Sequence, residues 1–141
     1  SKKKIKIVRV SNILGFSPKS PLVFPTFVKN AINKKKIVIS INKNSTKDFV
    51  HIDDVVEMIA KISIKGKENV YNIANGKNIK LIDLAENIKK IIKCSIVLKN
   101  QNKAIFEPKI NINKIKKEFN FKSKNIFENL NEVLKEYKNY F

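Results

Sequence analysis

The amino-acid sequence predicts an α/β fold, with short strands alternating with helices in a single domain, residues 1–141. Three observations indicate this class. Short aliphatic and β-branched runs alternate with stretches whose apolar residues recur every three or four positions. A chain of 141 residues is long enough for one hydrophobic core. Its apolar residues, 43% of the total, form no run near the roughly 18 residues that a membrane-spanning helix needs.

The first predicted elements are a strand and a helix. Residues 5–10 alternate apolar and basic side chains, as a strand does, and Gly15 and Pro18 mark a turn after it. Ser20 can cap the helix that follows, with Pro21 in its first turn. One apolar face of that helix recurs at helical spacing: Phe24, Phe27, Val28, Ala31 and Ile32.

The middle of the chain repeats this order. Residues 37–41 predict a strand, residues 42–46 a polar loop and residues 48–50 a brief extended piece before a helix that starts near Asp54. Asp54 and Glu57 stand three residues apart at this helix start, which is the spacing of a capping box. The acidic pair is therefore interpreted as structural.

The last part of the chain predicts two more strands and three helices. Residues 70–74 and 96–98 are the strand candidates. Residues 81–92 carry the clearest helical period, a short helix is expected near 113–118, and a last helix is expected over 127–137.

The charge and the cysteine count restrict the function classes. A formal net charge of +18 suggests a nucleic-acid partner, but Arg9 is the one arginine among 30 basic residues and the lysines are spread over every segment. A generally basic surface is the favoured interpretation, and a nucleic-acid-binding module is an alternative. Cys94 is the one cysteine, so no internal disulfide is expected, and with no visible signal peptide the predicted location is the cytoplasm.

The single histidine, His51, is the first candidate for catalysis. A triad of His51 and Asp53 with Ser11 or Ser45 would need these side chains to meet in space, and nothing in their spacing indicates that they do. One histidine with scattered acids is also a poor set of metal ligands. No catalytic residue and no metal site are therefore predicted.

Three phrases in order carry a family resemblance: RVSNILG at 9–15, KDFVHIDDVV at 47–56 and VYNIANGKNI at 70–79. They resemble the C-terminal part of the extended short-chain dehydrogenase/reductase family, the NAD-dependent nucleotide-sugar epimerases and dehydratases such as UDP-glucose 4-epimerase. The resemblance implies that the chain is the substrate-binding part of such an enzyme, with the N-terminal Rossmann core absent. Residues 1–15 then resemble the last Rossmann strand and its turn.

The resemblance also implies parts that this sequence lacks. Family members bind NAD through a glycine-rich turn and use a Y-x-x-x-K pair. The chain has three glycines, and neither Tyr71 nor Tyr137 has a lysine four residues on. The chain alone is thus expected to bind no cofactor and to be inactive, with NAD expected for the complete enzyme.

The family's substrate residues can be matched to positions in this chain. Asn12 resembles the asparagine that contacts the substrate diphosphate, with Ser11 beside it, and Lys47 stands where the family has an arginine. These three are the predicted substrate-binding residues for a UDP- or dTDP-sugar. Gln101 and Ala104 fall near a phosphate-binding arginine and a ribose-binding aspartate of the family, so nucleotide binding is weakened by two lost charges. A polar turn at 11–12 and a solvated Lys47 are the structural alternatives.

A second hypothesis follows from those two positions: a non-catalytic interaction or regulatory remnant that keeps the fold without the ligand. For the strand at 5–10, the resemblance implies neighbours on both sides. Its loss of neighbours predicts a homo-oligomer or pairing with another chain, because an unpaired apolar edge is an association site.

Overall fold

A computed structural model describes residues 4–141 of the chain. Its strands are β1 (Ile7–Val10), β2 (Asn12–Leu14), β3 (Lys36–Ile39), β4 (Thr46–His51), β5 (Val70–Ile73), β6 (Asn78–Lys80) and β7 (Ser95–Leu98). Its helices are α1 (Val23–Lys34), α2 (Ile52–Lys65), α3 (Leu81–Ile91), α4 (Asn113–Phe119) and α5 (Leu130–Tyr140). Strands and helices alternate as the sequence predicts.

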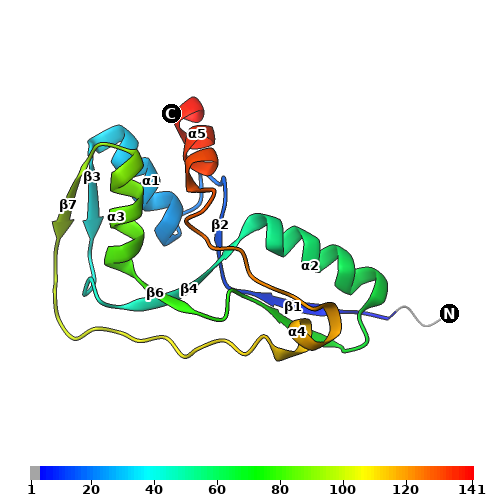
Figure 1. The fold of residues 1–141 in the computed structure, drawn as a ribbon. Coiled ribbons are helices and arrows are strands. Elements are labelled where there is room, and N and C mark those ends of the chain that lie inside the picture. Colours follow the sequence, from blue (N-terminus) through cyan, green and yellow to red (C-terminus); the bar gives the residue numbers. More distant parts are fainter. Residues whose placement is uncertain (1–3) are drawn as a thin grey trace.

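The strands form three small sheets. β1 pairs with β5 and β3 pairs with β7, both in parallel. β2 pairs in parallel with β4, which pairs antiparallel with β6 on its other side. Figure 1 shows the β2-β4-β6 sheet between the other two, so that it joins the two ends of the molecule. Residues 99–112 run along the lower side of this view from β7 to α4.

Two hydrophobic clusters follow this division. The larger one packs α1, α3 and α5 together with β3, around Phe24, Ile37, Leu84 and Tyr137. The smaller one packs α2 and α4 against β5, around Met58, Tyr71 and Ile115. Strands of parallel sheets are usually covered by helices. β5 follows this rule, because α2, which precedes it in sequence, and α4, which follows it much later, both pack in the same cluster.

Most predicted elements are confirmed, and the differences lie at short strands and helix starts. β2, of three residues, lies where a turn is predicted, and β6, also of three residues, is a strand that the sequence does not predict. α1 begins at Val23 with Leu22 as its N-cap, so Ser20 is not the cap. Pro25, without an N–H, occupies the first turn in which helical N–H groups lack intrahelical partners.

The start of α2 also differs from the prediction. Its N-cap is His51, whose ring Nδ1 accepts a hydrogen bond of 3.1 Å from the backbone N–H of Asp53. The prediction of a capping box formed by Asp54 and Glu57 is wrong, because the helix begins at Ile52, two residues before Asp54. No described helix, over residues 4–141, is long and apolar enough to cross a membrane.

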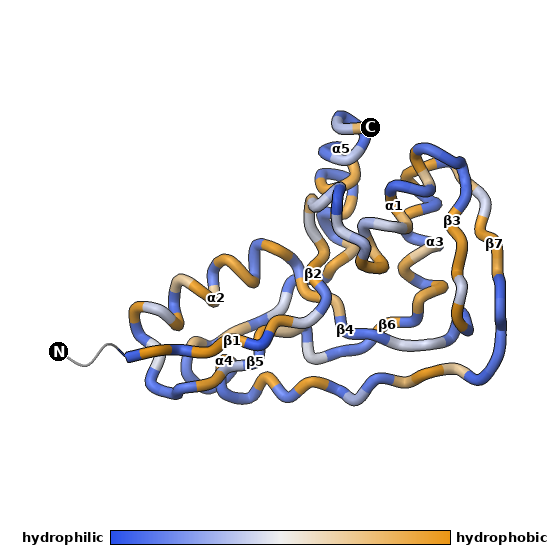
Figure 2. The backbone as a smooth tube through the Cα atoms, turned by 180° about the vertical axis from the view of Figure 1, so that it is seen from behind, coloured by the Kyte–Doolittle hydropathy of each residue, from blue (hydrophilic) through white to orange (hydrophobic). Residues whose placement is uncertain are grey.

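The strand predicted at 5–10 is shorter and has one neighbour. β1 starts at Ile7, and within the described chain only β5 pairs with it. Ile7 in β1 is 53% exposed, and Ile5, which precedes the strand, is 78% exposed. Figure 2 shows β1 as a mostly hydrophobic stretch at one end of the molecule. Residues 1–3 of the predicted domain lie outside the described residues.

Candidate functional site

The predicted site residues Ser11 and Asn12 lie where two parallel strands end side by side. Ser11 directly follows β1, and its N–H donates to the carbonyl oxygen of Ile73, the last residue of β5, at 3.0 Å. Carboxyl ends of parallel strands meet at one edge of a sheet, which is the usual position of ligand sites in α/β proteins. The loop of Asn75 and Gly76 after β5 therefore lies against the Ser11 turn.

Asp48, in β4, holds these two turns together. Its side chain is 1% exposed and accepts three hydrogen bonds. The donors are the Ser11 hydroxyl at 2.6 Å, the Asn75 N–H at 2.9 Å and the Gly76 N–H at 2.8 Å. A buried carboxylate is stable in a protein when hydrogen bonds replace its hydration, as they do here.

Gly76 has the backbone conformation that this arrangement requires. Its φ is +82°, and a Cβ at this position would lie 2.8 Å from Cδ1 of Ile112. A residue with a side chain would be strained both by its φ and by this contact. The glycine thus lets the backbone turn its N–H toward Asp48.

Asn12 is fixed by the same strand. Its side-chain Nδ2 donates to the backbone carbonyl of Asp48 at 2.9 Å. This leaves the Oδ1 of Asn12 as an acceptor. The Ser11 hydroxyl gives its only hydrogen to Asp48, so toward a ligand it can act only as an acceptor. Ser11 is therefore suited to accept a hydrogen bond from a ligand hydroxyl group, whereas Asn12 can accept through Oδ1 or donate through the second hydrogen of Nδ2.

A cavity of about 410 Å³ opens beside Ser11. Ser11, Ser17 and Ser20 contribute to its lining together with the exposed residues Phe16 and Leu22. Mostly apolar walls with a few polar groups are typical of small-molecule sites, and this volume lies within their usual range of about 300–1,000 Å³.

Lys47 does not join this cluster. Its ammonium group pairs with the carboxylate of Glu107, and its side chain is 24% exposed. Glu107 is held in place because its backbone carbonyl accepts a hydrogen bond of 2.6 Å from the Asn78 side chain. A ligand phosphate would therefore have to compete with Glu107 for Lys47.

Gln101 and Ala104 have no cationic or anionic group to offer, as their residue types imply. The Gln101 Oε1 accepts from the Lys43 N–H at 2.9 Å, and its Nε2 donates to the carbonyl of Ile41 at 3.1 Å. Gln101 thus fixes the loop after β3. Ala104 is half-buried.

The cluster at His51 is structural. The His51 ring is 4% exposed, and because its Nδ1 accepts the Asp53 N–H, its proton lies on Nε2, which has no partner among the described residues. Asp54 is also buried and accepts a hydrogen bond of 2.8 Å from the Lys124 N–H, so it ties α2 to the segment before α5. Burial raises the pKa of the Asp54 carboxyl above its ordinary value, against the opposing effect of Lys124.

The hypothetical triad is not assembled. Ser11 donates to Asp48, the Ser45 hydroxyl accepts from the Ile105 N–H at 3.0 Å, and the His51 ring faces the α2 terminus. Over residues 4–141 there is also no group of three or more His, Cys, Asp or Glu side chains that could hold a metal ion.

Sequence reasoning missed the two residues that organise this region. Asp48 stands inside the KDFVHIDDVV phrase, and its position in a predicted extended segment next to Phe49 and Val50 indicated burial of a charge that needs partners. Glu107 carried no such signal, because its contact with Lys47 joins residues that are 60 positions apart.

The glycine-rich turn that NAD requires does not fit the described residues. A Cβ on Gly15 would lie 2.8 Å from Cβ of Ile52, and one on Gly66 would lie 2.5 Å from the carbonyl oxygen of Ile62. Gly76 likewise lies against Ile112, so a side chain at any of the three glycines would clash with the protein's own atoms. None of these positions leaves a backbone surface for a pyrophosphate.

Comparisons with known proteins give one family. The model of the NAD dependent epimerase/dehydratase family matches residues 2–74. A dTDP-D-glucose 4,6-dehydratase of Dictyostelium discoideum is 36% identical over 91 residues, which are 64% of this chain and 20% of that protein.

Solved structures show the same fold. The dTDP-glucose 4,6-dehydratase from Bacillus anthracis, in complex with NAD, is 26% identical with a TM-score of 0.77 over 94% of this chain and 44% of its own. A UDP-N-acetylglucosamine 4-epimerase from Methanobrevibacter ruminantium, in complex with UDP-N-acetylmuramic acid, has a TM-score of 0.80 over 95% of this chain and 46% of its own, at 21% identity. The chain spans less than half the length of these relatives.

These findings correct the expected position within the family. The expectation of a C-terminal, substrate-binding part with the N-terminal Rossmann core absent is wrong. The family model matches residues 2–74, the first half of the chain, and this half contains the parallel pairs β1-β5 and β2-β4, the second of which is joined through α1 and β3. They support an N-terminal, Rossmann portion of the extended short-chain dehydrogenase/reductase fold, the portion to which NAD binds in the family. The physical reason for the error is that short phrases identify a family, whereas a place in its sheet depends on strand pairing.

Proposed function

Because this chain belongs to the NAD-dependent epimerase/dehydratase family, we propose that residues 1–141 act as one nucleotide-sugar-binding unit, with Ser11, Asn12 and Lys47 as ligand contacts. The observation that carries the proposal is the set of hydrogen bonds at Asp48. It fixes Ser11 and Asn12 where the parallel strands β1 and β5 end, and a cavity of about 410 Å³ opens beside Ser11. A UDP- or dTDP-sugar is the proposed ligand class.

Each contact has a distinct part in this proposal. The acceptor atoms of Ser11 and Asn12 hold the hydroxyl-bearing part of the ligand, because neither side chain carries charge. Lys47 supplies the positive charge for the diphosphate, in exchange for Glu107. This exchange makes the diphosphate contact weak in the unmodified chain, since two anions compete for one ammonium group.

We also propose that the chain alone binds no NAD and turns over no substrate. The family uses NAD, but the three glycines here lie against other residues of the protein, and the sequence contains no Y-x-x-x-K pair. The non-catalytic remnant is the second candidate function, favoured by the neutral Gln101 and Ala104. The cytoplasmic location remains a prediction.

The test is an NMR chemical-shift titration of the labelled chain with UDP-glucose and dTDP-glucose, with NAD as a comparison. We expect saturable shifts at the amides of Ser11, Asn12 and Lys47 with a sugar nucleotide. Asn12→Ala should weaken binding by roughly tenfold if it removes a hydrogen bond to the ligand. Lys29→Gln is the matched surface control, because Lys29 is exposed and far from these residues in sequence.

Glu107→Gln separates the role of Lys47 from a general effect of charge. Neutralising Glu107 frees the ammonium group, so affinity for a sugar nucleotide should rise, and Glu107→Gln combined with Lys47→Gln should lose the gain. Silence with every sugar nucleotide from a folded sample would reject the proposed function and favour the remnant. Turnover of either sugar nucleotide by this chain with NAD would refute the inactivity.

A further inference from the structure

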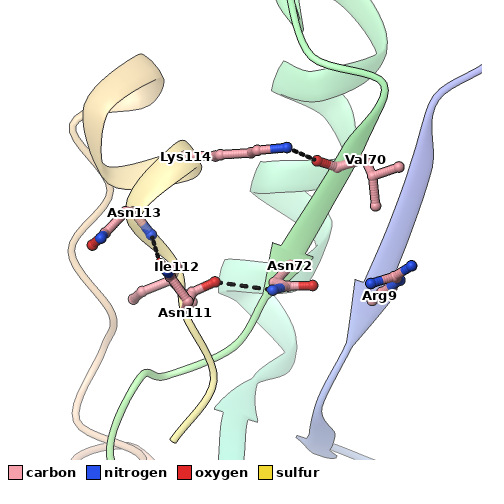
Figure 3. A pocket seen from close by; sticks show the side chains of 7 residues that line it. All are labelled: Arg9, Val70, Asn72, Asn111, Ile112, Asn113 and Lys114. Atoms are coloured by element: carbon pink, nitrogen blue, oxygen red, sulfur yellow. Dashed lines mark hydrogen bonds between the residues drawn. The ribbon is translucent and has the colours of Figure 1, made fainter.

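A second hollowed region lies on the outer side of the β1-β5 sheet, away from the cavity at Ser11. Two adjoining hollows of about 310 and 490 Å³ share Asn111, Ile112 and Asn113 in their linings. Figure 3 shows the first of them, with α4 on one side, Asn72 of β5 in the middle and Arg9 of β1 on the other side. We call the two hollows together the basic trough, after its cationic lining residues Arg9, Lys77, Lys109, Lys114, Lys116 and Lys122.

The charge of the basic trough is uniform. None of its lining residues is Asp or Glu. Lys114 lies 3.6 Å from a carboxylate oxygen of Glu68 and donates to the Val70 carbonyl at 3.1 Å. Within residues 4–141 the other five cations have no ion pair, although the chain forms such pairs elsewhere. The trough therefore keeps an uncompensated positive potential in a concave site, where charge acts more strongly than on a convex surface.

The polar floor of the trough is fixed by its own hydrogen bonds. The Asn72 side chain donates to the Asn111 carbonyl at 3.0 Å, and the Asn111 side chain accepts from the Asn113 N–H at 2.9 Å. Both bonds are drawn in Figure 3. The side-chain amide of Asn113 makes no hydrogen bond with another described residue and remains a donor for a ligand. The floor is thus ordered before a ligand arrives.

Arginine is placed here although the chain otherwise uses lysine. Arg9 is the one arginine among 30 basic residues, and it pairs in register with Asn72 on the neighbouring strand. A guanidinium group can hold two phosphate oxygens at once, which an ammonium group does not do. The composition of the chain accounts for lysines at any surface position, but it does not account for this arginine beside an asparagine floor.

We infer that the basic trough binds a small ligand that carries two or more phosphate groups. Its two joined hollows match the size of small-molecule sites, and its cations with no carboxylate complement a multiply charged anion. A single-stranded nucleic acid is the less suited partner, because the one aromatic lining residue, Phe121, is only 6% exposed and offers no face for base stacking. The inference does not depend on the proposed function, since the trough shares no lining residue with the cavity at Ser11.

The test is a titration of the labelled full chain with inorganic pyrophosphate at low ionic strength, followed by amide chemical shifts. Saturable shifts are expected at Asn72, Asn111 and Asn113, with Ser11 and Asn12 unchanged. Sulfate at equal ionic strength should give weaker shifts, because it offers a single anionic group. Arg9→Gln combined with Lys116→Gln should weaken pyrophosphate binding by roughly tenfold or more.

The matched control is Lys19→Gln combined with Lys135→Gln, which removes the same charge from two exposed positions outside the trough. Pyrophosphate affinity that falls equally in both double variants would overturn the inference, since general charge would then explain binding. Shifts that stay linear, or that concentrate at Ser11, Asn12 and Lys47, would overturn it as well. A short DNA duplex that shifts the trough amides at lower concentration than pyrophosphate would reject the small-ligand assignment in favour of a nucleic-acid backbone.

Discussion

At the residue scale, Asp48 is expected to contribute strongly to stability, because three hydrogen-bond donors depend on its one buried carboxylate. Asp48→Asn leaves a single acceptor oxygen and turns an NH₂ group toward an N–H or O–H donor, so at least one buried donor loses its partner. We expect the free energy of unfolding to fall by about 1–3 kcal/mol in urea titrations. Glu128→Gln is the control for an exposed carboxylate. An unchanged unfolding midpoint in Asp48→Asn would contradict the role of Asp48.

Asp54 predicts a dependence of stability on pH. Burial raises its pKa in the folded chain, so between its ordinary pKa and the raised value the folded state binds more protons than the unfolded state. The contribution of Asp54 to the free energy of unfolding therefore decreases as the pH rises through this interval. Asp54→Asn keeps an oxygen for the Lys124 N–H and removes the buried charge.

At pH 7, Asp54→Asn should be at least as stable as the unmodified chain, and this relative gain should shrink as the pH falls toward about 4. Urea unfolding at several pH values measures both. Asp83→Asn serves as the comparison, because Asp83 is an exposed carboxyl in the first turn of α3. A pH dependence that Asp54→Asn leaves unaltered would rule out Asp54 as its source.

At the scale of elements, the start of α2 depends on an unusual cap. His51 satisfies the Asp53 N–H but buries an Nε2 without a partner among the described residues. Asparagine is a strong N-cap and has no second ring nitrogen to bury. We expect His51→Asn to be about 1 kcal/mol more stable to unfolding than His51→Ala, which cannot cap. Equal stabilities in thermal and urea unfolding would show that the cap contributes little.

At the scale of the whole molecule, the free edge of β1 is the predicted association site. Its outer side is unpaired within the described chain, and Ile5 and Ile7 are exposed there. The homo-oligomer or paired chain remains a proposal. Replacing both isoleucines by lysine should shift the chain toward monomer in light scattering coupled to gel filtration. Ile64→Lys is the matched control, since Ile64 is 79% exposed but lies on a helix. A monomer at all concentrations before substitution would contradict the proposal.

The sequence by itself determined the local structure of this protein and its family. The helical period of residues 81–92 and the β-branched runs at 70–74 and 96–98 predict their elements because such patterns depend on neighbours in sequence. The three ordered phrases, the single arginine and the three glycines were also readable from the sequence alone. The prediction that Ser11, Asn12 and Lys47 bind the substrate also came from these phrases.

The tertiary structure decided what depends on distant residues. It paired β1 with β5 and β2 with β4, which no phrase encodes, and the match to residues 2–74 then corrected the expected place of the chain in the family. It placed Asp48 between two turns and Glu107 against Lys47. Contacts of this kind join residues tens of positions apart. Their energy comes from burial and charge in the folded chain, so the structure was needed to find them.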